Sequence, residues 1–319
     1  MTGDRPLVVV ADPLGAQGLD LLREHLQVTV ADDEQALAQA LPHAHALVVR
    51  SRTNVTADVL QAGSNLRLVA RAGIGVDNID VAAATRRNIL VINAPLGNVR
   101  STAEHTVALL FALARRIVGA DLAVRNGNWK SGYEGMQVAG KALGLVGAGK
   151  VGKTVASMAQ AMGMEVSAYD PYLPAAAMQD LNIQPLTLDA VLRQSDIVSL
   201  HVPLSDDTRN LIDAAALARM KSGSYLINCA RGGLVDEDAL TEALTRGHLA
   251  GAALDVYAHE PLRNSGLLHA PNLVLSPHVA ASTREAQKQV SIDIAAGVLD
   301  FFAGRPASFP INSAVLHKV

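Results

Sequence analysis

Short apolar runs alternate with longer segments of helical periodicity along the chain. In its first third, runs rich in Val, Ile and Leu predict five strands, at Leu7–Ala11, Val28–Ala31, Ala46–Val49, Leu66–Ala70 and Ile89–Ile92. Helical segments such as Gly18–Leu26 and Glu34–Leu41 lie between them. Apolar strands separated by helices are typical of βαβ units and of a parallel sheet buried on both faces. The first third therefore predicts a small doubly wound α/β domain.

A long amphipathic segment separates these strands from a second set. It runs from Ser101 to about Asn126, and Ser101-Thr102-Ala103-Glu104 has the pattern of a capping box at a helix start. The second set contains six predicted strands, at Ala142–Gly147, Glu165–Asp170, Ile197–Leu200, Tyr225–Asn228, Ala250–Val256 and Leu273–Leu275. We therefore expect a second, larger parallel sheet.

The last helical segment, Thr283–Ala303, is followed by no further predicted strands. We expect it to pack on the first domain, which makes the second domain an insertion. The predicted boundaries are residues 1–94 with 285–319 for one domain and residues 95–284 for the other. A chain of 319 residues also exceeds the size at which a single core usually divides.

Composition narrows the class of protein. Half of the residues are hydrophobic and 18% are charged, which is enough apolar material for packed cores. The net charge of −3 comes without a basic stripe, so we expect no nucleic acid partner. No apolar run reaches the roughly 18 residues of a membrane span, and no signal-peptide pattern opens the chain. The lone cysteine, Cys229, fits a reducing compartment, so we expect a cytoplasmic protein with no bound metal.

A glycine-rich turn follows the predicted strand at Ala142–Gly147. It reads Gly147-Ala148-Gly149-Lys150-Val151-Gly152. Gly147 permits a tight turn, Gly149 lets the backbone approach a pyrophosphate, and Gly152 lets helix and strand pack closely. This spacing is typical of a dinucleotide-binding βαβ unit.

The residues beyond this turn extend the cofactor prediction. The amides of Lys150 and Val151 would face the phosphates at the positive end of a helix dipole. Asp170 ends the next strand about 18 residues beyond Gly152, where an acid accepts hydrogen bonds from the adenosine ribose and repels a 2′-phosphate. A glycine-rich turn that merely packs is the alternative interpretation. We expect NAD rather than NADP, bound to a Rossmann or flavodoxin-like α/β fold.

Candidate catalytic residues lie in the polar segments that follow the last three predicted strands. These segments contain Arg231, Glu260 and His278, and the carboxyl ends of parallel strands border the ligand site of an open α/β sheet. Oxidation of a hydroxy acid needs a carboxylate anchor, a base and a hydride acceptor, and Arg, His and NAD can fill these roles. A carboxylate beside the His would orient its ring and favour its charged form. Each of the three residue types, taken alone, is more often structural.

The chain resembles the D-isomer-specific 2-hydroxyacid dehydrogenases over essentially its whole length. The runs that carry the resemblance are Arg71–Asp80, Asn93-Ala94-Pro95 with Ser101–His105, the glycine motif, Asn228–Asp236, and His278 with its neighbours. The resemblance implies a catalytic Arg231 and Glu260 and an acid/base His278. It also supports the inserted cofactor domain.

The resemblance implies further residues near the cofactor. They are His201, Pro203, Thr208, Cys229, Ala230 and Asp255. Asp255 would lie beside the nicotinamide carboxamide, and Thr208 in a loop near the cofactor. His201 lines the adenine pocket or, as an alternative, packs at a strand end. Cys229 adjoins the catalytic Arg and is expected to pack or to contact the cofactor.

Arginines of the first domain favour a phosphorylated substrate. Arg50-Ser51-Arg52 and Arg71 follow two of its strands, and a cluster of guanidinium groups suits a phosphate. Similar members of the family carry arginines at the matching places, which favours D-3-phosphoglycerate over glycerate or lactate, and hence serine biosynthesis. The alternative is that two of the three arginines are solvated. The residues expected to bind substrate are Arg50, Ser51, Arg52, Arg71, Gly73, Ile74 and Gly75, the last three through backbone amides at the substrate carboxylate.

Other features leave alternatives open. The segment Trp129–Glu134 is neutral where relatives often are more basic, which weakens the phosphate assignment. Many relatives continue into a domain that binds serine, so a chain that ends at Val319 is expected to be a short form or a truncated one. The alternative functions are glyoxylate or hydroxypyruvate reduction and an NAD-sensing corepressor-type binding protein. The apolar segment Ser101–Asn126 and the resemblance together predict a homodimer through the cofactor domain.

Overall fold

The computed structural model describes residues 5–129 and 132–318. The chain divides into two compact units, Met1–Asn98 with Ser282–Val319 (unit 1) and Val99–Ala281 (unit 2). Each unit is built on a parallel sheet with helices on both faces. The predicted class, α/β with two doubly wound parallel sheets, is confirmed.

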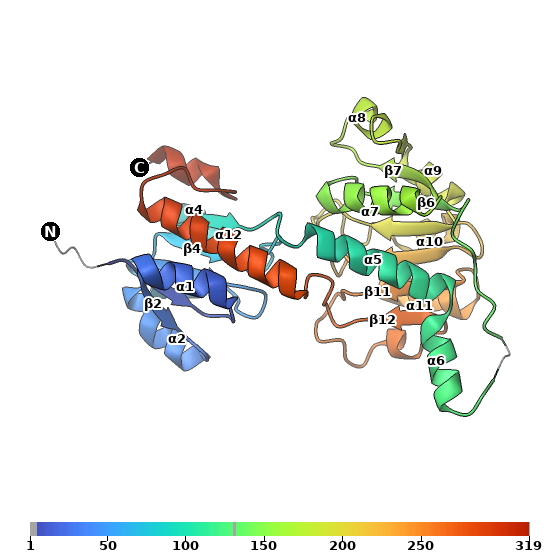
Figure 1. Ribbon diagram of the computed structural model, residues 1–319, viewed down its shortest axis with the longest axis horizontal. Helices are drawn as coiled ribbons and strands as arrows, with labels where there is room; N and C mark the ends of the chain where they lie inside the picture. The colour runs from blue at the N-terminus through green and yellow to red at the C-terminus, as the bar shows by residue number, and fades with distance from the viewer. Residues whose placement is uncertain (1–4, 130–131, 319) are drawn as a thin grey trace. The chain divides into compact units, whose positions relative to one another are not determined.

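Unit 1 contains a five-stranded parallel sheet in the order β2-β1-β3-β4-β5 (Figure 1). Its strands are β1 (Leu7–Val10), β2 (Gln27–Val30), β3 (Ala46–Val49), β4 (Leu68–Arg71) and β5 (Leu90–Asn93). Successive side chains of a strand point to opposite faces. Val8 and Val10 therefore join one core, whereas Val9 joins the other.

The helices of unit 1 cover these two faces. Helices α1 (Ala16–His25) and α12 (Arg284–Phe302) pack together over one face, so the last long helix returns to the first strands. Their backbones approach closely, because a Cβ at Gly18 would lie 2.2 Å from the Ser291 carbonyl oxygen. The other elements of unit 1 are α2 (Glu34–Ala40), α3 (Ala57–Ala62), α4 (Val81–Arg86) and the 3-10 turns η1 (Leu41–His43) and η3 (Ser313–Lys318).

Unit 2 contains a seven-stranded parallel sheet in the order β12-β11-β10-β9-β6-β7-β8. Its strands are β6 (Ala142–Val146), β7 (Glu165–Tyr169), β8 (Gln184–Pro185), β9 (Ile197–Leu200), β10 (Tyr225–Asn228), β11 (Gly251–Leu254) and β12 (Leu273–Leu275). Strand β8 was not predicted from the sequence. It has two residues and includes Pro185, which lacks a backbone N–H and suits only an edge position.

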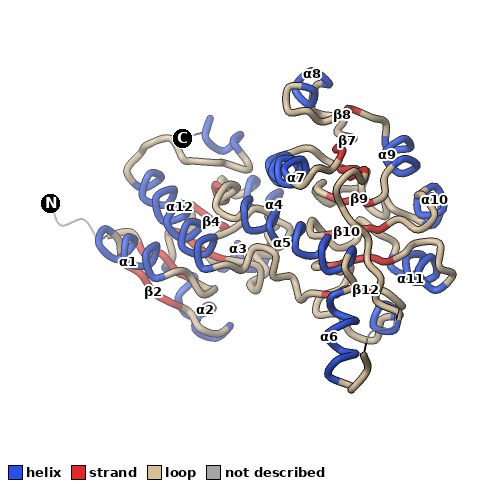
Figure 2. The backbone as a smooth tube through the Cα atoms, turned by 45° about the vertical axis from the view of Figure 1, so that its right-hand side comes forward, coloured by secondary structure: helices blue, strands red, loops and turns tan. Residues whose placement is uncertain are grey.

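Helices cover both faces of the second sheet as well. Helices α9 (Leu188–Gln194), α10 (Ala214–Arg219) and α11 (Glu237–Thr245) lie along one side, and α7 (Lys150–Ala161) lies on the other (Figure 2). The remaining elements are α5 (Val99–Ala114), which packs beside α7, α6 (Ile117–Arg125), α8 (Ala175–Gln179) and η2 (Gly266–His269). Because α7 follows β6, its first residues lie at the edge of the sheet where the strands have their carboxyl ends.

The long helix expected from Ser101 to about Asn126 is two helices. Helix α5 ends at Ala114, and α6 turns away from its direction (Figure 1). Arg116 lies between them with a φ of 51°, a left-handed conformation that ends a right-handed helix. Amphipathic periodicity continues through such a break, so the pattern of side chains did not reveal it.

The predicted capping box is wrong. Helix α5 begins at Val99, two residues before the expected cap, and Ser101 is buried within its first turn. Glu104 is paired with Arg100 at 2.7 Å, one helical turn earlier. Two residues of the neutral segment Trp129–Glu134, at positions 130 and 131, lie outside the described residues.

In the part of the chain that the structure describes, no helix has the length and apolar character needed to cross a membrane. Across residues 5–129 and 132–318, no group of three or more His, Cys, Asp or Glu side chains has the arrangement of a metal site.

Candidate active site

The glycine-rich turn joins β6 to the first turn of α7. Gly147 has a φ of 98°, and a Cβ there would lie 2.7 Å from the His201 carbonyl oxygen. A Cβ at Gly152 would lie 2.4 Å from the Gly147 carbonyl oxygen. Nothing lies within 4 Å of a Cβ built at Gly149, the residue before α7. Two of the glycines are therefore required by packing, whereas Gly149 leaves space in front of the helix N-terminus, where the amides of Lys150 and Val151 begin α7.

Asp170 lies beside this turn at the end of β7. Its Oδ2 accepts a hydrogen bond from the Ala148 N–H at 2.8 Å, and its Oδ1 accepts from the N–H groups of Tyr172 and Leu173 at 2.9 and 3.1 Å. A carboxylate has about four lone-pair positions, so it retains acceptor capacity for a ligand. The arrangement holds a negative charge next to the glycine turn.

His201 and its loop lie at the neighbouring strand end, because β9 pairs with β6. Burial lowers the pKa of His201 to about 4, so its ring is neutral at physiological pH. The ring Nε2 lies 3.0 Å from Ser199 Oγ. Thr208 closes the following loop, since its hydroxyl donates to the Pro203 carbonyl oxygen at 2.7 Å and accepts from the Ser205 N–H at 2.7 Å.

Arg231 lies in a turn that Asn228 organises from the end of β10. The Asn228 amide donates to the Arg231 carbonyl oxygen at 2.8 Å, and its Oδ1 accepts from the Ala230 N–H at 3.0 Å. This role of Asn228 was not predicted from the sequence. Cys229 is buried in the same turn, and burial raises its pKa to about 12, so it is not a thiolate nucleophile.

Glu260 and His278 form a hydrogen-bonded pair. His278 Nδ1 lies 2.7 Å from Glu260 Oε2, and both side chains retain access to solvent, at 45% and 36% exposure. The other carboxylate oxygen of Glu260 accepts from the Tyr257 N–H at 3.1 Å. Burial alone would raise the pKa of Glu260, but the hydrogen bond and charge of His278 outweigh it and lower that pKa. Because the bond to Glu260 uses Nδ1, the second ring nitrogen of His278, Nε2, remains available for proton exchange.

A fully buried carboxylate holds the turn that carries His278. His278 has a φ of 54°, which a non-glycine residue adopts only when its surroundings impose it. The two following N–H groups, of Val279 and Ala280, donate to Asp255 at 3.0 and 2.8 Å. Asp255 therefore holds the backbone turn that carries the His278 imidazole.

Asp255 has two side-chain neighbours that sequence reasoning did not assign. Ser276 Oγ donates to Asp255 Oδ1 at 2.6 Å, and His105 Nε2 lies 3.0 Å from Ser276 Oγ and 3.4 Å from Asp255 Oδ1. Burial alone would raise the pKa of Asp255, but its hydrogen bonds outweigh burial and lower the pKa. His105 supports the turn of His278 through this network.

The predicted substrate residues lie together in unit 1. Arg50, Ser51 and Arg52 follow β3, and Arg71 ends β4, the neighbouring strand. Gly73 has a φ of 153°, and a Cβ there would lie 1.5 Å from Arg71 Nη1, so the guanidinium lies against the glycine backbone.

Strand β5 holds the glycine loop that follows β4. The Asn93 amide donates to the Ile74 carbonyl oxygen at 2.6 Å, and the Ala94 N–H donates to the Gly73 carbonyl oxygen at 3.0 Å. These bonds fix the segment of Gly73, Ile74 and Gly75 that is expected to present its amides to a carboxylate. The predicted cofactor and catalytic residues, by contrast, all belong to unit 2.

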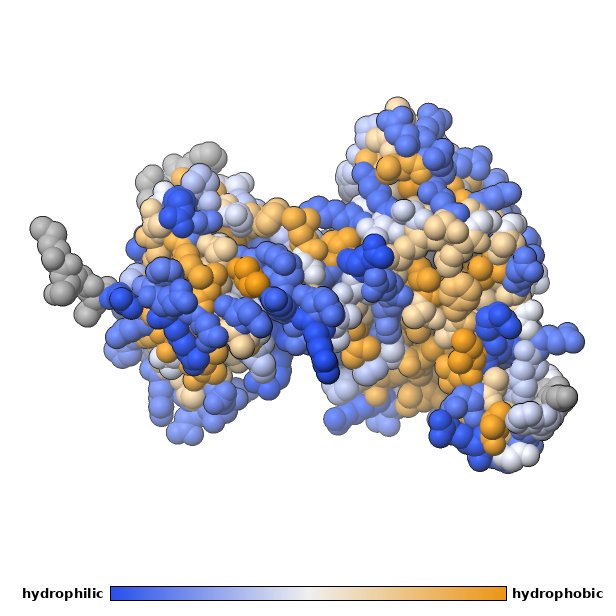
Figure 3. All heavy atoms as spheres, viewed as in Figure 1, coloured by the Kyte–Doolittle hydropathy of each residue, from blue (hydrophilic) through white to orange (hydrophobic). Residues whose placement is uncertain are grey.

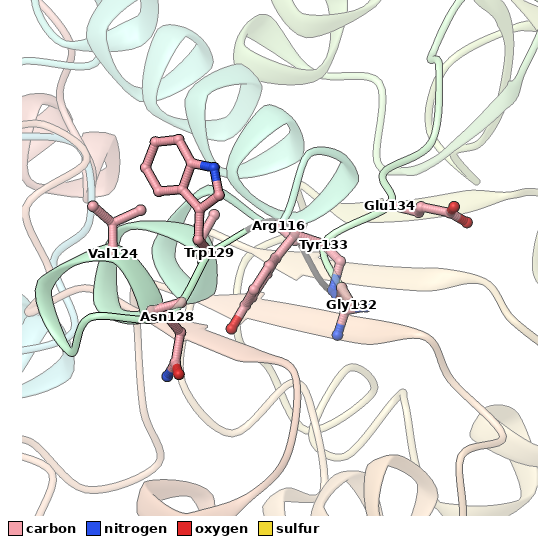
Figure 4. A pocket seen from close by; sticks show the side chains of 9 residues that line it. Arg116, Val124, Asn128, Trp129, Gly132, Tyr133 and Glu134 are labelled. Carbon is pink, nitrogen blue, oxygen red and sulfur yellow. Dashed lines mark hydrogen bonds between the residues drawn. The ribbon is translucent and has the colours of Figure 1, made fainter.

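A pocket of about 770 Å³ lies beside α6 (Figure 4). None of the predicted site residues lines it. Its lining comes from the residue before α6, from α6 and from the segment after it, and consists of Arg116, Ala120, Ala123, Val124, Asn128, Trp129, Gly132, Tyr133 and Glu134. Trp129 is 72% exposed there.

Comparison with known proteins relates this geometry to a family. Residues 107–280 match the model of the D-isomer specific 2-hydroxyacid dehydrogenase NAD binding domain. D-3-phosphoglycerate dehydrogenase of Mycobacterium tuberculosis is 45% identical over 318 residues, which is 98% of this chain and 60% of that protein. The curated relatives are longer, and the chain spans between 51% and 61% of their length.

Solved structures of this class superpose on the chain. D-lactate dehydrogenase from Aquifex aeolicus, complexed with NAD and lactic acid, has a TM-score of 0.83 and 26% identity, covering 93% of this chain and 96% of that chain. A glyoxylate reductase from Paecilomyes thermophila has a TM-score of 0.88 and 26% identity, covering 98% and 99%. Because the family model also matches more than half of its residues, the chain belongs to the D-isomer specific 2-hydroxyacid dehydrogenase family.

Proposed function

We propose that the chain is an NAD-dependent dehydrogenase that acts on carbon 2 of a D-2-hydroxy acid. The observation that carries the proposal is the Glu260–His278 pair, 2.7 Å apart, in the same unit as the glycine turn. Bound NAD supplies the hydride acceptor, and NADH the hydride donor in reverse. The turn at Gly147 and the first amides of α7 would hold its pyrophosphate, and Asp170 its adenosine ribose.

The proton chemistry rests on His278. In the oxidative direction Nε2 of His278 accepts the proton of the substrate hydroxyl, while the hydrogen on carbon 2 leaves as hydride. Glu260 stabilises the resulting imidazolium through Nδ1 and keeps the ring oriented. In the reductive direction the same imidazolium returns its proton to the carbonyl oxygen. Arg231 binds the substrate carboxylate, for which a guanidinium fork is well suited.

The cofactor preference rests on Asp170. Its carboxylate already accepts three backbone hydrogen bonds, which hold the charge beside the glycine turn. A 2′-phosphate would bring a second anion against it, and like charges at short distance repel. NAD is therefore the proposed cofactor.

D-3-phosphoglycerate, oxidised to 3-phosphohydroxypyruvate, is the proposed substrate. Relatives with 40% to 45% identity are named D-3-phosphoglycerate dehydrogenase. Arg50, Arg52 and Arg71 supply the positive charge that a phosphate needs. A glyoxylate or hydroxypyruvate reductase is the second candidate, favoured by the glyoxylate reductase with a TM-score of 0.88 and by the neutral segment Trp129–Glu134.

Steady-state turnover separates these functions. The rates are measured with D-3-phosphoglycerate, D-glycerate, hydroxypyruvate and glyoxylate, each with NAD(H) and NADP(H). The proposal predicts the highest kcat/KM for the phosphorylated acid with NAD. A higher value for glyoxylate would support the second candidate, and binding of NAD without turnover of any acid would identify a corepressor-type protein.

We also propose a cytoplasmic homodimer that associates through unit 2. Helix α6 exposes four large apolar side chains, Ile117, Val118, Leu122 and Val124, each between 44% and 55% exposed. The surface over α5 and α7 is also largely apolar (Figure 3). Exposed apolar surface is typical of a protein interface. The buried, protonated Cys229 suits a reducing compartment.

A further inference from the structure

The loop of residues 50–53, which carries two of the arginines proposed for phosphate, is held by a buried carboxylate. Asp12 follows β1, the strand beside β3, and its side chain is 1% exposed. Asp12 Oδ2 accepts from the Arg50 N–H at 2.5 Å and from the Thr53 N–H at 3.3 Å. Its Oδ1 accepts from the Thr53 hydroxyl at 2.8 Å. Both ends of the loop are therefore bonded to one side chain.

A second side chain holds the carbonyl groups of the same loop. Asn78 lies in the segment after β4, on the other side of β3 in the sheet. Its amide donates to the Arg50 carbonyl oxygen at 2.7 Å and to the Thr53 carbonyl oxygen at 2.6 Å. The Val55 N–H also donates to the Asn78 carbonyl oxygen at 2.7 Å, so the two segments continue side by side.

These contacts hold the loop backbone from two neighbouring segments of the sheet. A buried carboxylate is costly unless several donors satisfy it, and Asp12 has two N–H groups, a hydroxyl and, at 3.5 Å, the Nε of Arg52. Asn78 uses both of its amide hydrogens on the loop. The backbone at Arg50 and Thr53 therefore cannot move without breaking bonds to two neighbouring strand ends.

A fixed backbone matters for recognising a phosphate. A guanidinium binds phosphate through a rigid fork, and such a fork is effective only when its base is held within about 0.5 Å of the productive position. An unphosphorylated acid makes no such contact. Displacement of the loop should therefore affect binding of the phosphorylated acid selectively.

We propose that Asp12 and Asn78 are positioning residues that set the preference for a phosphorylated hydroxy acid. They act through the loop of residues 50–53 and do not touch the substrate. The inference rests on the proposed function, because it assigns to this loop the recognition of the substrate phosphate.

The test compares two acids that differ only in the phosphate. For Asn78→Ala and Asp12→Asn, kcat/KM is measured with D-3-phosphoglycerate and with D-glycerate, together with the KM for NAD and the Tm. Asn65→Ala is the matched control, because Asn65 also donates its amide to a backbone oxygen, that of Pro42 at 3.2 Å, between α3 and β4. Asp33→Asn controls for loss of a carboxylate that accepts a backbone N–H, that of Ala36 at 2.7 Å.

The expected result is a ratio of the two kcat/KM values that falls about ten-fold in Asn78→Ala, as loss of one or two hydrogen bonds allows. The fall should come from the KM of the phosphorylated acid, with the KM for NAD unchanged. Both controls should keep the parental ratio. Asn78→Ala removes no buried charge, so it keeps the inference testable if Asp12→Asn does not fold.

Other results would overturn the inference. An unchanged ratio in folded Asn78→Ala would mean that the loop is positioned without it. An equal loss with both acids would mean that the residue is structural only. Failure of the proposed function gives a different result, since the parent protein itself would then show no preference for the phosphorylated acid.

Discussion

Replacing Glu260 by Gln tests how the carboxylate controls proton transfer. The Glu260–His278 hydrogen bond of 2.7 Å then loses its charge but keeps its geometry. A charge-assisted bond contributes about 1.5–3 kcal/mol and a neutral one about 0.5–1.5 kcal/mol. The difference is about 1 kcal/mol, and it must be discounted because the side chains are 36% and 45% exposed. At about 1.36 kcal/mol per pH unit, the pH profile of the variant should shift by roughly half a unit.

The sign of this shift follows from the chemistry. The negative charge of Glu260 favours an imidazolium at His278 over a neutral ring, and the neutral side chain of Gln lacks this preference. Reduction needs the imidazolium, and oxidation needs the neutral ring. Both limbs of the pH profiles should therefore move to lower pH, and at pH 8 reduction should lose more rate than oxidation.

The assay is kcat/KM against pH in both directions, followed by the absorbance of the reduced nicotinamide. His278→Asn is the reference variant, and it should lose about 10²–10⁴-fold in kcat while the KM for NAD is largely kept. A Glu260→Gln profile that coincides with the parental one would refute the proposed coupling. A loss of less than ten-fold in His278→Asn would remove the acid/base role itself.

The remaining predictions concern cofactor, substrate, assembly and stability. Asp170→Ser should narrow the preference for NAD over NADP, and an unchanged ratio of the two kcat/KM values would exclude its role. Arg50→Ala should raise the KM for D-3-phosphoglycerate by roughly ten-fold to a hundred-fold and leave that for D-glycerate unchanged, with a smaller effect in Arg52→Ala because Arg52 lies 3.5 Å from Asp12. Leu122→Asp in α6 should shift the mass in light scattering from twice 33.4 kDa to 33.4 kDa, and a parent that is already monomeric would exclude the dimer. Hydrogen bonds lower the pKa of Asp255 in the folded protein. The ionised carboxylate therefore stabilises the folded state above the ordinary pKa range of Asp, and this stabilisation is lost as the pH falls through the pKa of the folded protein. Asp255→Asn should therefore reduce the free energy of unfolding at pH 7 by about 2–4 kcal/mol, with a difference from the parent that shrinks below about pH 4, as measured by urea unfolding.

The sequence predicted the features that depend on local pattern. Strands such as Ala46–Val49 were placed correctly because buried parallel strands are continuous apolar runs with sharp polar ends. The turn at Gly147 was identified because its glycines are required by backbone geometry, which allows few other residues. The candidate catalytic residues were expected beyond the strand ends because the strands of the sheet are parallel.

The features that were missed depend on contacts between distant segments. The break at Arg116 is a single left-handed residue, and a change at one residue leaves helical periodicity intact. The support of His278 by Asp255, Ser276 and His105 joins residues up to 171 positions apart, which no local pattern records. The same reason hid the bonds that Asp12 and Asn78 make with the loop after β3.

The path of the hydrogen on carbon 2 of the substrate shows directly whether the reaction is a hydride transfer to the nicotinamide. D-3-phosphoglycerate that carries deuterium at carbon 2 is incubated with the protein and NAD, and the mass of the NADH formed is measured. Each NADH should gain one deuterium, because the hydrogen moves directly as hydride while His278 takes only the hydroxyl proton. Unlabelled NADH, with the deuterium released to water, or no NADH at all would contradict it.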